Sequence, residues 1–200
     1  MQDISWIKPV TLEGQHVTLV PLSMAHSSEL IEAAADGELW KLWYAMVPSP
    51  EEMAGEIQRR LNLQQEGTML PFTVLERKTQ RILGMTTYMD VIAIHKRLEI
   101  GWTWYCKSAQ KTAINTETKL LLLTHAFETL QCVVVRLSTN SFNHNSQRAI
   151  KRLGAKLDGI LRNHRTMRNG AICDSYTYSI INSEWPTIKI NLREKLAGFS

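Results

Sequence analysis

The stretch from Leu98 to Gly154 restricts the possible folds of this 200-residue chain more than any other part of it. It opens with a predicted strand, Leu98–Tyr105, and a polar loop, residues 110–115, then leads into a helix predicted to begin near Thr116. A run of β-branched residues, Val133–Thr139, predicts a second, buried strand. Two strands joined through a helix are expected to pair in parallel, with a right-handed crossover.

The loop at 110–115 is the first candidate binding site. The first N–H groups of a helix have no partner within the helix, so a loop that feeds a helix N-terminus is suited to binding an anion. We therefore expect a ligand that carries phosphate groups. The alternative is an ordinary polar connection in which Thr116 caps the helix.

The rest of the chain predicts a mixed α/β sheet of the α+β type, mostly antiparallel, with helices on both faces. The further strands are predicted at Val17–Leu22, Phe72–Glu76, Ile82–Val91, Lys156–His164 and Ala171–Ile181. The helices are predicted at Ser23–Ala35, Glu51–Glu66, Thr116–Leu130 and Asn145–Leu153, with a short amphipathic piece at Ile188–Leu196. The segment Leu39–Val47 is compatible with a short helix or a loop.

Composition indicates one domain spanning residues 1–200, because a hydrophobic fraction of 44% is enough for a sizeable core. The net charge of +4 suits an anionic ligand, but the 23 lysines and arginines are spread out, so no nucleic acid partner is expected. The N-terminus lacks the pattern of a signal peptide, and no apolar run is long enough to span a bilayer. No membrane association is expected.

The cysteines are odd in number and widely spaced, at Cys106, Cys132 and Cys173. This pattern fits neither a disulfide framework nor a zinc site, which favours a reducing, cytoplasmic compartment. No cluster of His, Cys and Asp has the spacing of metal ligands, so no metal is expected.

Several short motifs occur in an informative order. They are Glu99-Ile-Gly-Trp102, the loop that begins with Gln110, Asn115-Thr-Glu117, Leu120–Glu128, Asn143-x-x-Ser146, Arg148–Ala155, Gly159–Arg162 and Asp174-Ser175. Together with the order of the elements, they resemble the GNAT family of acetyl-CoA-dependent N-acetyltransferases. Within it, they are most similar to the branch of the ribosomal-protein N-terminal acetyltransferases (RimJ/RimL-like). The resemblance covers residues 10–182, which leaves 183–200 as a C-terminal tail.

The resemblance implies a GNAT-like fold and a direct attack of a primary amine on the acetyl thioester of acetyl-CoA, which is a co-substrate. It implies that a backbone N–H near Trp104 or Tyr105 stabilises the oxyanion. Ser146 would protonate or hydrogen-bond the leaving thiolate, and Glu99 could act as general base through water. The residues implied in coenzyme binding are Trp102, Thr103, Trp104, Gln110, Lys111, Thr112, Ala113, Ile114, Asn115, Thr116, Asn143 and Ser146.

Two positions depart from the family pattern. Ala113 stands where the loop of the family has its first glycine, and a Cβ is tolerated there only if the backbone does not need a positive φ. Lys111 could compensate as a positive charge near the pyrophosphate. Ile150 fills the place of a tyrosine that many members use as general acid, which is why Ser146 is the candidate for that role.

Each candidate also has a structural interpretation. Asn143 could form a turn ahead of its helix, and Ser146 could cap or line the first turn. Glu99 could be an edge carboxylate paired with a cation. His164 and Asp174, on the last hairpin, are expected to be mainly structural.

Other side chains lie in regions that the family uses for substrates. Arg148, Lys151 and Arg152 could meet the outer phosphate of the coenzyme, although a solvated helix face is the default. The aromatic residues in the segment Leu39–Val47 (Trp40, Trp43 and Tyr44) could line the acceptor site or belong to the core. His125 is expected to be a packed histidine within its leucine-rich helix.

The acceptor stays open at this stage. The branch suggests a protein N-terminal α-amine, and a polyamine, an aminoglycoside-like drug or another small amine is the alternative. A regulatory module that binds acyl-CoA without efficient turnover is a second hypothesis, and a basic ribosome- or RNA-associated factor is a third. A homodimer formed through the C-terminal tail is a further expectation.

Overall fold

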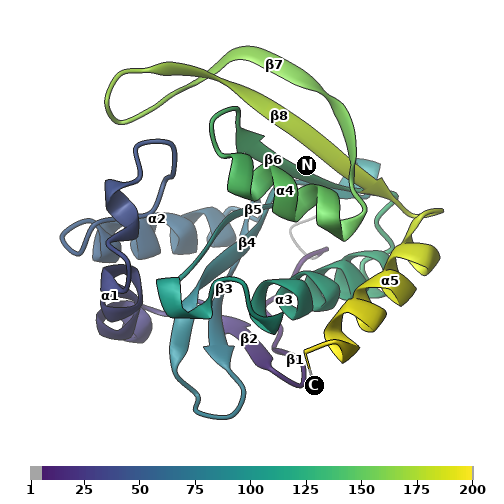
Figure 1. Ribbon diagram of the computed structural model, residues 1–200, viewed down its shortest axis with the longest axis horizontal. Helices are drawn as coiled ribbons and strands as arrows, with labels where there is room; N and C mark the ends of the chain where they lie inside the picture. The colour runs from purple at the N-terminus through teal and green to yellow at the C-terminus, as the bar shows by residue number, and fades with distance from the viewer. Residues whose placement is uncertain (1–5, 200) are drawn as a thin grey trace.

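A computed structural model describes residues 6–199 of the chain. In these residues eight strands form one sheet in the order β1-β2-β3-β4-β5-β6-β8-β7 (Figure 1). The strands are β1 (Leu12–Glu13), β2 (Val17–Pro21), β3 (Leu70–Glu76), β4 (Ile82–Ile92), β5 (Arg97–Tyr105), β6 (Val134–Asn140), β7 (Lys156–Thr166) and β8 (Ile172–Ile181). The α-helices are α1 (Ser27–Ala35), α2 (Met53–Gln65), α3 (Ala113–Thr124), α4 (His144–Leu153) and α5 (Trp185–Ala197).

Helices cover both faces of the sheet, as two adjacent residues of β4 demonstrate. Successive side chains of a strand point to opposite faces. Thr87 Oγ1 accepts a hydrogen bond from Arg60 of α2 at 2.9 Å, whereas the Tyr88 hydroxyl donates to the carbonyl of Leu122 in α3 at 2.6 Å. Thus α2 and α3 lie on opposite sides, α1 packs beside α2, and α5 packs against α3 (Figure 1).

The predicted mixed sheet with one parallel pair is confirmed. All predicted strands are present, and β5 and β6 form the parallel pair through the crossover helix α3. The two-residue strand β1 was not predicted. The undecided segment forms a 3₁₀ turn, Leu39–Lys41, followed by a loop, and the tail forms the full helix α5 rather than a short piece.

The start of the crossover helix differs from the prediction. Helix α3 begins at Ala113, three residues before Thr116, and its N-cap is Thr112, whose Oγ1 accepts from the N–H of Ile114 at 3.3 Å. The interpretation of Thr116 as the cap was therefore wrong. A π-helical stretch, His125–Thr129, continues the helix.

Helix α3 is fixed to the N-terminal part of the sheet by the carboxylate of Glu117. It accepts main-chain N–H groups from Gln15 at 2.8 Å, His16 at 2.6 Å and Val17 at 2.7 Å. A Cβ on Gly14 would lie 2.5 Å from the Cδ of Glu117, so the turn needs glycine there. Hydrogen bonds to a charged acceptor are stronger than neutral ones, which makes this a firm attachment of the helix.

The β7–β8 hairpin extends beyond the body of the protein and reaches over toward the α1–α2 side (Figure 1). Near its tip, the Arg168 guanidinium forms an ion pair with Glu52, just before α2, at 2.9 Å. No helix within residues 6–199 has the length and apolar character needed to cross a membrane.

Candidate active site

The sheet opens between its two central parallel strands. Strands β5 and β6 pair over only three positions, Arg97 with Val134, Leu98 with Val135 and Glu99 with Arg136. Beyond Glu99 both strands continue, but no further pairing joins them. The facing backbone groups of the two strands are therefore available to an extended ligand that carries amide groups of its own.

A β-bulge lies on β5 where this opening begins. Gly101 pairs with Thr87 and Trp104 pairs with Met85, so two residues of β5 face one of β4, and Trp102 has a left-handed φ of 48°. Bulges re-aim side chains and main-chain groups, and they are frequent beside active sites. The bulge thus turns the backbone of β5 just before Trp104 and Tyr105, where the resemblance expects an oxyanion to be stabilised.

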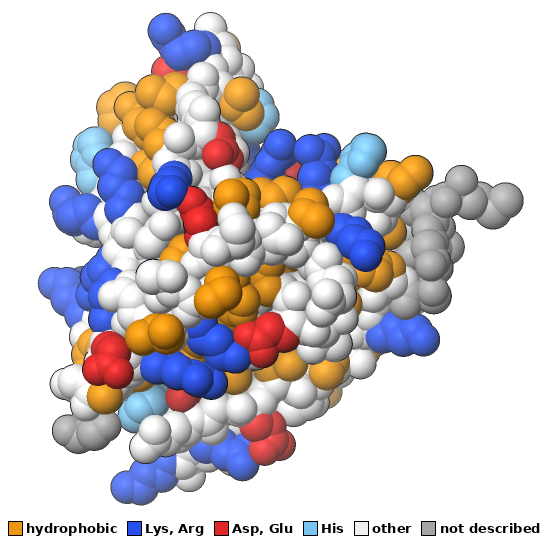
Figure 2. All heavy atoms as spheres, turned by 90° about the vertical axis from the view of Figure 1, so that its right-hand side faces the viewer, with side chains coloured by type: hydrophobic (Ala, Val, Ile, Leu, Met, Phe, Trp, Pro, Cys, Tyr) orange, Lys and Arg blue, Asp and Glu red, His pale blue; other side chains and the backbone are white. Residues whose placement is uncertain are grey.

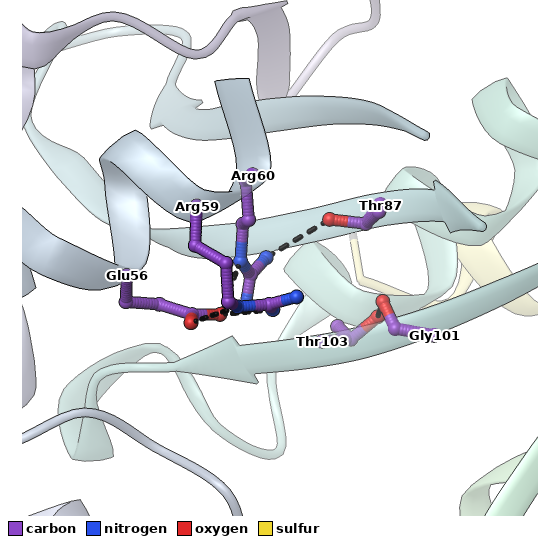
Figure 3. A network of polar contacts seen from close by, with 6 residues as sticks. All are labelled: Glu56, Arg59, Arg60, Thr87, Gly101 and Thr103. Carbon is purple, nitrogen blue, oxygen red and sulfur yellow. Dashed lines mark hydrogen bonds and ion pairs between the residues drawn. The ribbon is translucent and has the colours of Figure 1, made fainter. Parts of the chain in front are cut away.

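Arginines of α2 hold the side chain of Trp102 on one face of the bulge. The Cζ atoms of Arg59 and Arg60 lie 5.0 and 5.8 Å from the centre of its ring. Glu56 binds both guanidinium groups, and its Oε1 lies 2.8 Å from Arg60 Nε. Figure 3 shows these groups extending from α2 toward the strand that carries Thr87.

Arg60 is a charged residue that sequence analysis did not single out. Its side chain is fully buried, and its Nη2 has no hydrogen-bond partner among the described residues. The signal was present in the sequence, because Arg60 follows Met53 and Ile57 on the buried stripe of α2.

A buried lysine lies on the opposite face of the bulge and was also not anticipated. Lys119 Nζ, in α3, donates to Thr103 Oγ1 at 2.8 Å, and that oxygen lies 2.8 Å from Thr86 Oγ1. Burial lowers the pKa of Lys119 to about 7. No carboxylate forms an ion pair with it in the described part of the chain, so no opposite charge counteracts the effect of burial on its pKa.

The predicted anion-binding loop lies after β5 and ends in the first turn of α3. Gln110 Nε2 donates to the carbonyl of Tyr105 at 3.1 Å, and the Thr112 hydroxyl donates to the carbonyl of Ala109 at 2.7 Å. The left-handed residue of this loop is Lys111, with a φ of 63°. Because Ala113 has a helical backbone, its Cβ causes no strain, so this position does not need the glycine of the family.

Basic groups from two other helices approach this helix start. Arg152 Nη2, in α4, donates to Thr116 Oγ1 in the first turn of α3 at 3.3 Å. Lys195 Nζ, in α5, donates to the carbonyl of Arg152. Burial lowers the pKa of Lys195, and the nearby charge of Arg152 lowers it further. Elsewhere on this side of the protein, lysine and arginine side chains lie at several separate places rather than in one patch (Figure 2).

The predicted coenzyme residues therefore fall into three groups around the opening. Trp102, Thr103 and Trp104 lie on the splayed part of β5; residues 110–116 form the loop and the first turn of α3; Asn143 and Ser146 begin α4 after β6. Ile114, Thr116 and Ala113 are buried, whereas Asn115 is half-buried and Lys111 is exposed. The Nε1 of Trp104 is buried without a partner among the described residues, so this strand carries a free donor.

Asn143 and Ser146 are linked to each other. Asn143 is the N-cap residue of α4, and its Oδ1 accepts a hydrogen bond from the N–H of Ser146 at 3.0 Å. The side chain of Ser146 is half-buried. Gly154, with a φ of 101°, ends the helix as predicted.

The aromatic segment near Leu39–Val47 lies next to this second helix start. The ring of Trp43 packs against Phe142, just before Asn143, with centroids 5.2 Å apart, and against Tyr44 at 5.8 Å. Trp43 and Phe142 are both about half exposed. Chain segments far apart in the sequence thus form one aromatic border beside the start of α4.

Glu99 lies at the closed end of the opening and is buried. Burial raises the pKa of its carboxyl group, and the charge of Asp90 raises it further. A hydrogen bond from Ser138 Oγ at 3.1 Å and the charges of Arg165 and Arg136 act in the opposite direction. A buried carboxylate with a raised pKa, beside a cavity, is suited to accepting a proton near neutral pH.

This cavity has a volume of about 430 Å³ and lies between α2 and strands β4, β5 and β6. Its lining residues are Arg59, Leu63, Thr68, Met69, Met89, Asp90, Val91, Ile92, Arg97, Leu98, Glu99, Trp102 and Arg136. It therefore connects the candidate base with the bulge of β5.

The remaining candidates have structural contacts. His164 Nδ1 lies 2.9 Å from Ser175 Oγ, and Asp174 accepts from the N–H of Asn163 at 2.8 Å. His125 stacks on Tyr88, as expected of a packed histidine. Within residues 6–199, no three His, Cys, Asp or Glu side chains lie close enough to hold a metal ion.

Comparisons with known proteins identify the family. The model of the acetyltransferase (GNAT) domain matches residues 16–156, which is more than half of the chain. A protein from T. thermophilus, provisionally described as an acetyltransferase, has a similar structure at 32% identity, with a TM-score of 0.83 over 96% of this chain and 99% of that chain. A search of curated proteins found no match.

Two less similar structures share the fold. One is an acetyltransferase from Salmonella typhimurium that modifies the N-terminal serine of ribosomal protein L7/L12, with 19% identity and a TM-score of 0.76 over 86% of this chain and 99% of that chain. The other is RimL, a ribosomal L7/L12 α-N-protein acetyltransferase, in complex with coenzyme A, with 19% identity and a TM-score of 0.74 over 86% and 98%. The chain described here belongs to the GNAT family and is an acetyl-CoA-dependent N-acetyltransferase.

Proposed function

We propose that this protein binds acetyl-CoA across the opening between β5 and β6 and transfers the acetyl group to a primary amine in a ternary complex. The observation that carries the proposal is the end of β5–β6 pairing at Glu99, next to a bulge and a buried carboxylate. The loop before α3 and the start of α4 border the same opening.

The residues of the chain divide the work of the reaction. The first N–H groups of α3 at Ala113 and Asn115, together with the charges of Lys111 and Arg152, would hold the phosphates. Main-chain N–H groups at the bulge would stabilise the oxyanion. This arrangement orients the thioester toward the cavity that contains Glu99.

The reaction then needs a group that accepts the proton of the attacking amine and a group that donates a hydrogen bond to the leaving thiolate. As the new N–C bond forms and the C–S bond of the thioester breaks, Glu99 takes up the proton of the attacking nitrogen through a water molecule. Ser146, at the start of α4, would supply a hydrogen bond to the leaving thiolate. Ile150, in the place of the family's tyrosine, is buried and apolar, so it offers no such group.

The acceptor that we favour is a protein N-terminal α-amine. The similarity to RimL supports this choice at the level of the fold, and the aromatic border formed by Trp43 and Phe142 is open to solvent, where a peptide could lie. Small amines remain the alternative. The proposal treats the 200 residues as one domain acting in a reducing, cytoplasmic compartment, in keeping with three free, buried cysteines.

Two measurements test the function. Calorimetric titration with acetyl-CoA and with coenzyme A is expected to show binding, and a thiol-release assay with peptides of different N-terminal residues is expected to show turnover. Replacing Glu99 by Gln should lower turnover and leave coenzyme affinity unchanged. Coenzyme binding without thiol release from any amine would favour an acyl-CoA-binding module instead.

A further inference from the structure

The cavity beside Glu99 carries charges that its own residues do not neutralise. Its lining residues include two arginines, Arg97 and Arg136, and two acidic residues, Asp90 and Glu99. Within residues 6–199, neither Arg97, Arg136 nor Asp90 takes part in an ion pair. Arg97 is half-buried, whereas Arg136 and Asp90 are exposed, so groups of both signs that line this cavity are accessible to a ligand.

Arg59 differs from these two arginines. It also lines the cavity, but its Nε and Nη2 bind Glu56 at 2.7 and 2.9 Å, and its guanidinium lies over Trp102. The carboxylate of Glu56 compensates this charge only in part, because it also binds Arg60. Of the arginines that line the cavity, Arg97 and Arg136 are those without an ion pair within residues 6–199.

The register of the sheet places opposite charges side by side. Glu99 of β5 pairs with Arg136 of β6, and Arg97 lies two residues before Glu99, so its side chain points to the same face. Within residues 6–199 Glu99 forms no ion pair with either guanidinium, and its Oε2 accepts a hydrogen bond from Ser138. A ligand in the cavity therefore meets cationic and anionic groups within one or two residue spacings of each other.

The rest of the lining limits the size and polarity of the ligand. The walls between the charged groups are apolar, formed by Leu63, Met69, Met89 and Ile92. A volume of about 430 Å³ is near the lower end for ligand pockets and suits one amino acid or the first residues of a peptide.

We propose, on the basis of the function given above, that the acceptor is a primary amine that carries a carboxylate close to it. The amine faces Glu99 and Asp90, and the carboxylate binds Arg136 and Arg97 in charge-assisted hydrogen bonds. Two acceptors have this chemistry, a free α-amino acid and a peptide N-terminus whose first residue is acidic. A polyamine does not fit, since its additional positive charges would lie near two unpaired arginines.

The test compares matched acceptors that differ only in the carboxylate. Thiol release is measured with Asp-Phe amide against Asn-Phe amide, and with free phenylalanine against phenylalanine amide. Wild-type protein is expected to prefer the carboxylated member of at least one pair by about tenfold in kcat/KM, the size of one charge-assisted contact. The first pair reports a peptide acceptor and the second a free amino acid.

Variants connect the preference to the two arginines. Arg136→Gln and Arg97→Gln are each expected to reduce the preference by about tenfold. The preference is the ratio of kcat/KM for the two members of a pair. Comparing this ratio between the wild type and a variant cancels the difference in basicity between the two amines. Arg193→Gln, on the exposed surface of α5, is the matched control and should keep the wild-type preference. The inference would be overturned if the wild type turned over the two members of each pair equally. It would also be overturned if the preference survived in both Arg136→Gln and Arg97→Gln.

A binding measurement separates this inference from the proposed function. Each member of both pairs is titrated calorimetrically into protein saturated with coenzyme A. Tighter binding of the carboxylated member of at least one pair, lost in Arg136→Gln, supports the charged acceptor site even if no amine is acetylated. Loss of turnover with every amine would reject the proposed function, whereas equal or absent binding within both pairs would reject the charged acceptor site.

Discussion

The carboxylate of Glu117 accepts a hydrogen bond from the main-chain N–H of Val17 at 2.7 Å, across 100 residues of sequence. The same carboxylate also binds the N–H groups of Gln15 and His16. One side chain thus attaches α3, the helix that follows the candidate anion-binding loop, to the turn between β1 and β2. The motif Asn115-Thr-Glu117, taken as a family resemblance in the sequence, has a structural role at its last residue.

Replacing Glu117 by Gln should destabilise the protein by about 2 kcal/mol, because a neutral amide accepts fewer and weaker hydrogen bonds from the three N–H groups. Urea denaturation measures the loss. Glu66→Gln, at an exposed position, is the control and should change stability by less than about 0.5 kcal/mol. A similar effect of the two substitutions would contradict the role assigned to Glu117.

Lys119→Met should raise stability at neutral pH and change its pH dependence. The folded protein binds the proton of Lys119 only below about pH 7, whereas the unfolded chain binds it up to its ordinary pKa of 10.5. In the wild type the free energy of unfolding therefore decreases as pH falls from about 10.5 to about 7, because only the unfolded chain takes up the proton there. Below about pH 7 the loss of stability stays constant. The variant should be more stable by about 4 kcal/mol at pH 7, because each pKa unit corresponds to about 1.4 kcal/mol, and the difference should be smaller at high pH.

Chemical denaturation at several pH values between these limits measures the effect of Lys119→Met. Lys78→Met, on the surface, serves as the control, since that lysine is exposed. A stability difference between wild type and Lys119→Met that does not vary with pH would show that the amine is not buried in its neutral form.

Glu99→Gln should lower kcat by about 100-fold, the typical contribution of a general base. Burial raises the pKa of Glu99 from 4.5, so the wild-type rate should fall as pH is lowered through that raised pKa, where the base becomes protonated. The variant should lack this acidic limb. If the kcat profile of Glu99→Gln, measured between about pH 5 and 9, still showed the same acidic limb as the wild type, Glu99 would be excluded as the base.

Two substitutions at Asn143 separate capping from catalysis. Asn143→Ala removes the acceptor for the Ser146 N–H and should cost about 1 kcal/mol of stability, whereas Asn143→Ser can still cap α4. If the amide N–H of Asn143 binds the coenzyme or supports turnover, both variants should lose about tenfold in kcat/KM. If Asn143→Ser kept wild-type kinetics, the role of Asn143 would be limited to capping α4.

Much of the fold was predictable because its signals are local. The β-branched run before Asn140 and the apolar spacing of α2 mark their elements directly, and the parallel pairing of β5 and β6 follows from the helix between them. The start of α3 was misplaced because Thr112 and Thr116 are equally good caps in sequence. The turn at Lys111 selects the first of them.

The candidate site was only partly predictable, for a different reason. Lys119 and Arg60 are long charged side chains, which are exposed by default, and their burial depends on helices that pack against the bulge of β5. The contact of Trp43 with Phe142 likewise joins segments that no local pattern connects. Residues of the loop and of β5 could be found from motifs, whereas the charges that surround them required the packed structure.

The brief pairing of β5 with β6 has a mechanical consequence. Strands β1 to β5 and strands β6 to β8 form two parts of one sheet, which are joined by three residue pairs between β5 and β6. An extended molecule bound in the gap would hydrogen-bond to both strands and so connect the two parts over a greater length. Occupancy of the gap should thus stiffen the whole architecture as well as deliver the reactive group.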